Sequence, residues 1–231
     1  MDDRLSPGHR QRAALLALVF ASGICLALLA SRTLFAQRWE LGFYPWNLVL
    51  AWIPFLLARR IYGLRARRSP RYWLLGVCAV LWFFFFPNAP YIVTDLLHLK
   101  TRTPVPKWFD LVLMVSFAWT GLCLGYLSLY LMQEVVRSRL GRRWSWRFVV
   151  AMLALSSFGI YLGRFERWNS WDVLARPLGL ASDVVQRVSF AGNAEMFAFS
   201  ATFFAFSLLT YATLFALTHL HGHPPRESDR G

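Results

Sequence analysis

Residues 72–94 read YWLLGVCAVLWFFFFPNAPYIVT, a run of 23 residues that contains no Asp, Glu, Lys or Arg. A helix needs about 20 consecutive apolar residues to cross the hydrocarbon core of a bilayer, with a range of about 17–25. Five further charge-free runs occur at Ala13–Ser31, Leu41–Ala58, Leu111–Gln133, Phe148–Gly163 and Met196–Pro225. The pattern predicts an all-α, polytopic membrane helix bundle with about six transmembrane helices.

The expected transmembrane domain covers residues 13–219. Its spans are predicted at about 13–31, 41–58, 72–87, 110–133, 148–164 and 196–218. Composition agrees, because apolar residues make up 57% of the chain and charged residues 16%, against roughly 45–50% and 25% in soluble domains. The first apolar run exceeds the roughly 7–15 residues of a cleaved signal peptide, so we expect an uncleaved helix. Residues 1–12 and 220–231 are expected to be cytoplasmic tails, the second disordered.

The basic residues indicate how the chain is oriented. The net charge is +13, which in a soluble protein would suggest nucleic acid. Here the basic residues lie between apolar runs, which favours anionic lipids over nucleic acid as their partners. With the N-terminus inside, sixteen of the 25 Lys and Arg residues fall on the inner side. The positive-inside rule therefore predicts an inner-membrane protein with both termini in the cytoplasm.

The end of the third run contains the first group of candidate functional residues. Pro87 and Pro90 should end the helix, and a new helix is expected over residues 91–99. In an α-helix, Tyr91, Asp95 and His98 would form one polar stripe. This segment is predicted to be an amphipathic helix at the outer interface, where Asp95 and His98 could do acid–base work or simply form its wet face.

The second group follows the fifth run, where residues 164–172 read RFERWNSWD. An aromatic belt with snorkelling arginines would explain the Trp and Arg residues, but less easily Asn169 and Asp172. Arginine is suited to bidentate recognition of phosphate or carboxylate. Arg164 and Arg167 are therefore candidates for holding an anionic group.

Polar groups at a membrane edge must find partners, and topology places the unusual ones on the outer side. We predict that two segments, one after Pro87 and one after Gly163, meet above the bundle. The candidate catalytic residues are Asp95, His98 and Asp172. The candidate binding residues are Asn47, Asn88, Tyr91, Arg164, Arg167 and Asn169. Asp110 is expected in the same polar layer.

Small residues recur on the fourth and fifth predicted helices and indicate close helix packing. They are Ala118, Gly121, Gly125 and Ser128 on the fourth helix, and Ser156, Gly159 and Gly163 on the fifth. No common catalytic motif occurs in the sequence, and no cofactor is expected. A metal on Asp95 and His98 would need further ligands, one of which Asp172 could supply, and no metal site is predicted.

Four segments resemble the bacterial membrane proteins known as the domain of unknown function 1361. They are WNLVLAWIP at 46–54, FPNAPYIVTDLLHL at 86–99, SFGIYLGRF at 157–165 and RWNSWD at 167–172. The resemblance covers roughly residues 43–211. It implies a multi-pass membrane protein in a bacterium, and it implies no activity.

Three functions remain open from the sequence. The first is an outward-facing site that binds or modifies an envelope lipid or an anionic headgroup, as an enzyme or as a binding protein. The second is a non-enzymatic membrane partner or assembly factor, in which a protein partner or a homo-oligomer would use the small-residue stripes. The third is a small-solute transporter, which is disfavoured because no charged residue falls at a predicted helix centre.

Overall fold

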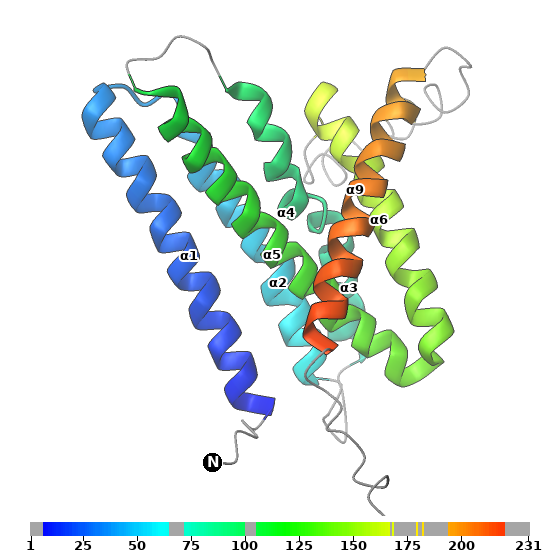
Figure 1. Cartoon of the computed structure of the whole chain (residues 1–231). Helices are drawn as coiled ribbons and strands as arrows, with labels where there is room; N and C mark the ends of the chain where they lie inside the picture. Colours follow the sequence, from blue (N-terminus) through cyan, green and yellow to red (C-terminus); the bar gives the residue numbers. More distant parts are fainter. Residues whose placement is uncertain are drawn as a thin grey trace, which may run out of the picture. The chain divides into compact units, whose positions relative to one another are not determined.

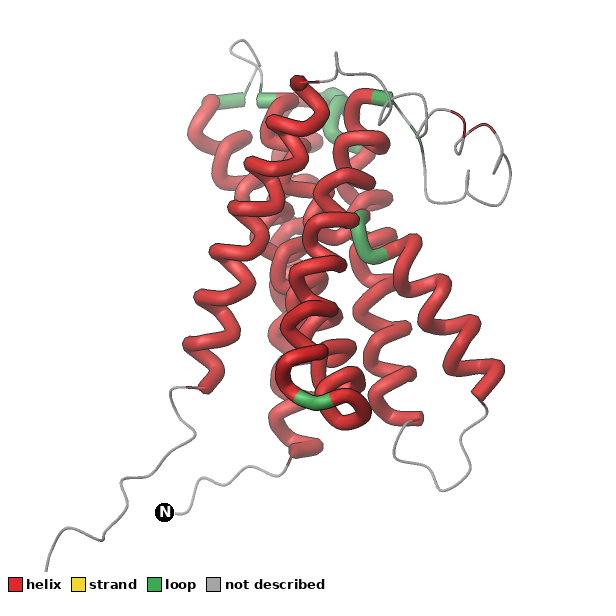
Figure 2. Tube along the Cα trace, turned by 90° about the vertical axis from the view of Figure 1, so that its right-hand side faces the viewer, coloured by secondary structure: helices red, strands yellow, loops and turns green. Residues whose placement is uncertain are grey.

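The computed structural model of the chain describes residues 7–64, 72–99, 105–166, 168, 179, 182 and 194–219. Within these residues every regular element is a helix (Figure 2), which confirms the predicted all-α class. The chain divides into two units, Met1–Val135 and Val136–Gly231, and each is described by itself.

Six helical segments in the described part of the chain are long and apolar enough to cross a membrane. They are Arg12–Ala36, Phe43–Leu64, Tyr72–His98, Lys107–Leu140, Arg142–Phe165 and Ala194–Thr218. The chain is therefore a multi-pass membrane protein, as predicted. Most of these helices extend past the charge-free runs, because helical hydrogen bonding continues through the charged residues that flank a membrane core.

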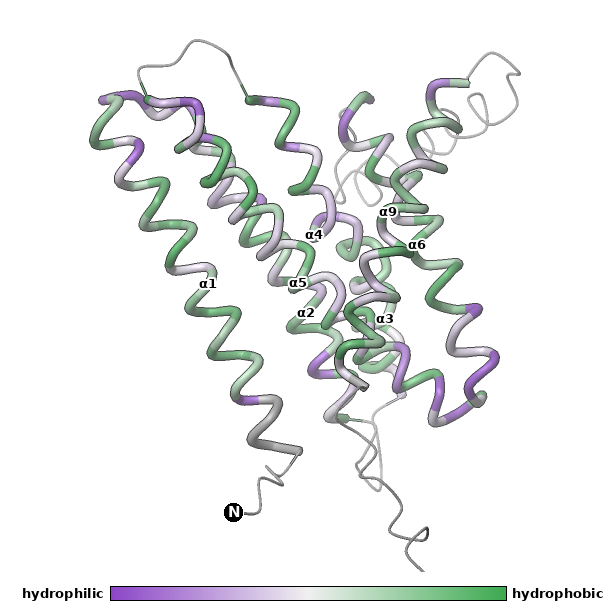
Figure 3. The backbone as a smooth tube through the Cα atoms, in the orientation of Figure 1, coloured by the Kyte–Doolittle hydropathy of each residue, from purple (hydrophilic) through white to green (hydrophobic). Residues whose placement is uncertain are grey.

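In unit 1 the helices run alternately up and down (Figure 1). They are α1 (Pro7–Ala36), α2 (Phe43–Leu64), α3 (Tyr72–Phe85) and α5 (Lys107–Leu140). The end of α1 and the starts of α2 and α5 consequently lie together at the upper end of unit 1 in Figure 1. Figure 3 shows α1 as mostly apolar along its length, with polar residues at this end.

The third span is broken within the unit. After α3, the short helix α4 (Asn88–Tyr91) and the 3₁₀ helix η1 (Ile92–His98) complete it. The 14 residues of α3 cover only about 21 Å at 1.5 Å each, less than the roughly 30 Å of the hydrocarbon core. The break at the two prolines is confirmed, and α4 and η1 are needed to finish the crossing.

The prediction of an α-helix over residues 91–99 is wrong, because most of this segment forms another type of helix. Ile92–His98 is a 3₁₀ helix, in which three residues make one turn. Three consecutive β-branched residues, 92–94, lower the preference for an α-helix here. As a result His98 follows Asp95 by one turn, whereas Tyr91 falls out of the expected stripe.

α4 lies directly against α5. A Cβ atom on Gly121 would stand 2.7 Å from the backbone oxygen of Ala89, and one on Gly125 would stand 3.1 Å from the Ala89 Cβ. These distances leave no room for a side chain on Gly121. The predicted small-residue face of this helix is therefore confirmed as a packing face.

Neutral side-chain hydrogen bonds join the helices of unit 1 in their apolar middle. The Trp82 indole on α3 donates to the Ser128 hydroxyl on α5 at 2.6 Å, and this hydroxyl donates to the Pro54 carbonyl on α2 at 3.1 Å. The Trp52 indole likewise donates to Ser22 of α1 at 3.1 Å. Such bonds satisfy polar groups where no water is available.

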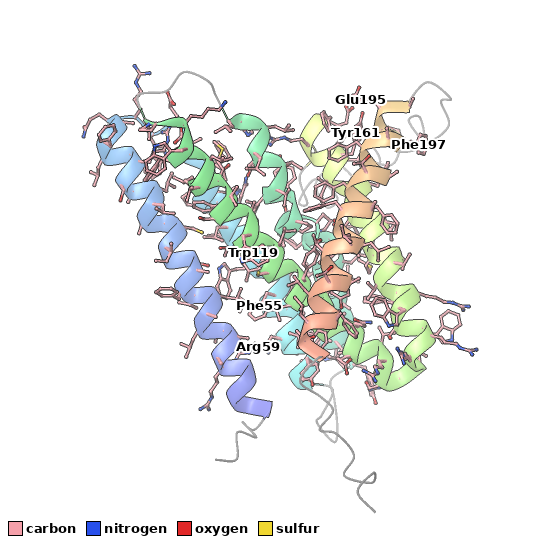
Figure 4. The ribbon with its side chains drawn as sticks, in the orientation of Figure 1. Phe55, Arg59, Trp119, Tyr161, Glu195 and Phe197 are labelled. Carbon is pink, nitrogen blue, oxygen red and sulfur yellow. The ribbon has the colours of Figure 1, made fainter. Side chains whose placement is uncertain are left out.

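Unit 2 contains a pair of long helices, α6 (Arg142–Phe165) and α9 (Ala194–His219). Aromatic rings pack between them at both ends. The pairs are Trp146 with Phe215 at 5.0 Å between centroids, and Phe165 with Phe199 at 5.2 Å. This pairing makes the helices antiparallel. In Figure 4, Tyr161 and Glu195 lie near one end of this pair.

A methyl group at Gly121 should destabilise the protein, because it would meet the Ala89 backbone. Overpacking of this kind costs about 1–3 kcal/mol. A Cβ atom added to Gly23 on α1 would meet no atom within 4 Å, and replacing a helical glycine by alanine otherwise stabilises by about 0.5–1 kcal/mol. We expect Gly121→Ala to lower the thermal unfolding midpoint in detergent and Gly23→Ala to leave it equal or higher. Equal midpoints for both variants would contradict this packing.

Reporter fusions test the predicted orientation. Green fluorescent protein fused after Gly231 should fluoresce, and alkaline phosphatase fused after Leu99 should be active, because the first reporter works inside and the second outside. As a control, the two reporters are exchanged. Green fluorescent protein fused after Leu99 should then not fluoresce, and alkaline phosphatase fused after Gly231 should be inactive. The opposite pattern would reverse the predicted topology.

Candidate functional site

The upper end of unit 1 brings polar side chains from four elements together. The end of α1 contributes Arg32, the turn before α2 contributes Glu40, η1 contributes Asp95 and His98, and the start of α5 contributes Asp110. The up-and-down order of the helices brings these segments together, because the chain reaches this end after α1 and again after η1 (Figure 1).

Asp95 is a buried carboxylate with two polar neighbours. Its side chain is 1% exposed, and the Asn47 amide donates to its Oδ2 atom at 2.8 Å. His98 Nδ1 lies 3.9 Å from its Oδ1 atom, which is longer than a hydrogen bond but close enough for electrostatic attraction. Burying an ionised carboxylate is costly unless donors surround it, so Asn47 and His98 stabilise its charge.

His98 is placed to exchange protons. It is 44% exposed, its ring lies 5.0 Å from that of Phe43, and it follows Asp95 by one turn of η1. A carboxylate beside an imidazole orients the ring. The predicted acid–base pair is therefore brought together in the fold, with the carboxylate inside and the imidazole at the surface.

Arg32 and Asp110 form a buried ion pair. Arg32 Nε donates to Asp110 Oδ1 at 2.8 Å and Nη2 to Oδ2 at 3.4 Å, and both side chains are 2% exposed. Arg32 Nη2 also lies 3.5 Å from Glu40 Oε2. The parallel arrangement of two N–H groups on one carboxylate is the strongest geometry for such a pair.

A small cavity joins these groups. It has a volume of about 60 Å³ and is lined by Arg32, Glu40, Leu41, Phe43, His98, Asp110 and Met114. Among the described residues, no atom accepts a hydrogen bond from the buried Nη1 of Arg32. An unmet donor in a membrane interior is unfavourable by several kcal/mol. Arg32 therefore lines the cavity and has one N–H donor group that is not used by the described residues.

The other candidate residues of the first segment lie at the break in the third span. The Asn88 amide donates to the Phe85 carbonyl at 3.0 Å, and so satisfies an acceptor at the end of α3. The Tyr91 carbonyl accepts from the Thr94 hydroxyl at 2.7 Å. Both of these hydrogen bonds therefore satisfy backbone carbonyl groups near the break.

The second predicted segment lies in unit 2. Arg164 is partly buried in the last turn of α6. Arg167, Asn169 and Asp172 lie outside the described residues. Their roles, and the meeting of this segment with the first, stay predictions.

A model of the family described as protein of unknown function (DUF1361) matches residues 46–210. The chain belongs to this family. The matched part of the chain contains Asn47, Asp95, His98 and Asp110, whereas Arg32 and Glu40 precede it. No curated protein and no solved structure shows a significant match to the chain.

Arg32 and Glu40 are the site residues that the sequence did not single out as functional candidates. Arg32 comes directly after an apolar run, where an arginine normally reaches toward the membrane surface. Its partner Asp110 is 78 residues away along the chain, so no local sequence pattern indicates that the two residues form an ion pair. The one available signal was that both residues are charged and adjoin the same membrane face.

Removing one member of the buried pair should be strongly destabilising. Asp110→Leu leaves the buried Arg32 with only the partly exposed Glu40 as a partner, and breaking a buried pair costs about 3–5 kcal/mol. The double variant Arg32→Met with Asp110→Leu should recover most of this loss, since well-packed apolar residues can replace a buried pair. Thermal unfolding in detergent measures both effects. A double variant no more stable than Asp110→Leu alone would contradict the pairing.

Proposed function

We propose that the upper end of unit 1 binds the headgroup of an envelope lipid, and that Asp95 and His98 exchange protons with it. The observation that carries this proposal is a small cavity lined by both Arg32 and His98, together with the buried Nη1 atom of Arg32, which has no acceptor among the described residues. A donor and an ionisable ring around one small cavity can hold a polar group and act on it.

The position of the site along the spans supports a lipid ligand. Asp110 is the fourth residue of a 34-residue helix, and Arg32 is followed by only four more residues of α1. Both therefore lie near the ends of spans, where headgroups meet the hydrocarbon core. A lipid can bring its headgroup to this depth without leaving the membrane.

The proposed chemistry is general acid–base catalysis. Asp95, held by the Asn47 amide at 2.8 Å, would stabilise the protonated form of His98 as His98 takes a proton from the headgroup. His98 is the accessible member of the pair, with 44% of its side chain exposed, so it would make the contact with the lipid. Asp95 would act through His98 as a positioning residue.

A separate proposal is that unit 2 binds an anionic group. It rests on Arg164 and Arg167, whose guanidinium groups suit phosphate. We further propose that the site faces the non-cytoplasmic side, because the inner loops contain most of the arginines.

The transporter alternative is less well supported. A broken span such as the third one does occur in transporters. However, the side chains that bond between helices in the middle of unit 1, Trp82 with Ser128 and Trp52 with Ser22, are neutral. An ion or proton path would be expected to place ionisable groups there. We therefore favour a headgroup site.

Lipids that co-purify with the protein test the proposal. Asp95→Asn and His98→Gln should reduce the amount of specifically retained lipid roughly tenfold, because each removes a charge-assisted contact worth about 1.5–3 kcal/mol. Mass spectrometry of the purified protein in mild detergent measures the retained lipid.

Glu195→Gln is the control for this experiment, because it neutralises an exposed carboxylate at the start of α9 (Figure 4). It should retain as much lipid as the native chain. If Asp95→Asn and His98→Gln unfold at the native temperature and also retain native amounts of the same lipids, the proposal is wrong.

A further inference from the structure

The charges around the cavity argue against a phosphate as its occupant. The positive charges here already have carboxylate partners: Arg32 lies 3.5 Å from Glu40 and 2.8 Å from Asp110, and the exposed Arg38 lies 3.5 Å from Glu40. Asp110 already occupies two N–H groups of the guanidinium. A phosphate placed beside Arg32 would bring its charge close to both carboxylates, and like charges repel strongly in a poorly solvated site.

The hydrogen-bonding groups around the cavity favour an uncharged ligand that both accepts and donates hydrogen bonds. Arg32 Nη1 is a buried donor without an acceptor among the described residues. Glu40, 32% exposed at the rim, offers carboxylate oxygens that only accept. A hydroxyl group has one donor and two acceptor lone pairs. It can accept from Arg32 and donate to Glu40 at the same time without adding charge.

The remaining walls and the size of the cavity fit a hydroxyl on a short carbon chain. Phe43, Leu41 and Met114 line the cavity and can pack against C–H groups. The volume is about 60 Å³, which exceeds the roughly 10–15 Å³ that a cavity needs to hold one water molecule. The cavity therefore has room for a small polar group such as CH₂OH.

We propose that the cavity binds a hydroxyl group of a glycerol or sugar headgroup, held between Arg32 and Glu40. This inference rests on the proposed headgroup site and names the chemical class of its ligand. The headgroup is thus recognised by its hydroxyl and not by its phosphate.

Four lipids separate hydroxyl recognition from charge recognition. Phosphatidylglycerol is anionic and has hydroxyls, and phosphatidylmethanol is anionic without a hydroxyl. Monoglucosyl diacylglycerol is neutral with hydroxyls, and phosphatidylcholine is neutral without one. Binding of each to the purified full chain is measured by native mass spectrometry in mild detergent. We expect each hydroxyl-bearing lipid to bind about tenfold more tightly than the lipid of equal charge that has no hydroxyl. Comparing phosphatidylglycerol with monoglucosyl diacylglycerol then shows whether the bound hydroxyl comes from glycerol or from a sugar.

Two variants link this preference to the cavity. Arg32→Lys keeps a positive charge beside Asp110 but removes the Nη1 donor, and Glu40→Ala removes the acceptor at a partly exposed position. Each should reduce the tenfold preference to about twofold or less. Arg38→Lys is the matched control, because Arg38 also lies 3.5 Å from Glu40 but is 66% exposed. It should keep the native preference, and Glu40→Ala provides the answer if Arg32→Lys does not fold.

Three results would overturn the inference in distinguishable ways. If both anionic lipids bind alike and more tightly than both neutral lipids, and Asp95→Asn weakens that binding, the hydroxyl is not recognised although the headgroup site stands. If binding of all four lipids is unchanged by Asp95→Asn, Arg32→Lys and Glu40→Ala, the hydroxyl inference and the proposed function both fail. A hydroxyl preference that survives Arg32→Lys and Glu40→Ala would place recognition outside this cavity.

Discussion

The close approach of α4 to α5 is the constraint on which unit 1 depends. Gly121 and Gly125 leave space for the backbone of Ala89, so the broken third span can enter the bundle instead of lying outside it. A break exposes backbone groups that lipid cannot satisfy, and here they are covered by α5 and by the Asn88 amide. This contact also sets where η1 begins, and therefore where Asp95 and His98 lie.

Polarity is graded along unit 1. In the middle of the spans the helices are joined by neutral donors and acceptors such as Trp82 and Ser128. At the upper end the helices are joined by charged side chains, as in the pair of Arg32 and Asp110. A buried ion pair contributes little net stability, but it is costly to break and can enforce one arrangement of helices. Glu40 and the cavity beside this pair leave one guanidinium nitrogen for a ligand.

Much of the fold could be predicted because the bilayer imposes simple rules. A span must be about 20 residues long and nearly free of charge, so the six helices were visible as runs. Pro87 and Pro90 cannot continue a helix, and the spacing of Gly121 and Gly125 shows a packing face. The type of helix over residues 92–98 was not predictable, because propensity differences there are small and packing against α2 and α5 decides between them.

The sequence by itself determined the spans, the break in the third of them and the polar character of its far end, since each follows from local composition. Only the tertiary structure decided which of the polar residues meet. It placed Asn47 on Asp95 and paired Arg32 with a carboxylate 78 residues away. Such pairings depend on the order and rotation of packed helices, and no local pattern records them. The cavity exists only as a consequence of that packing.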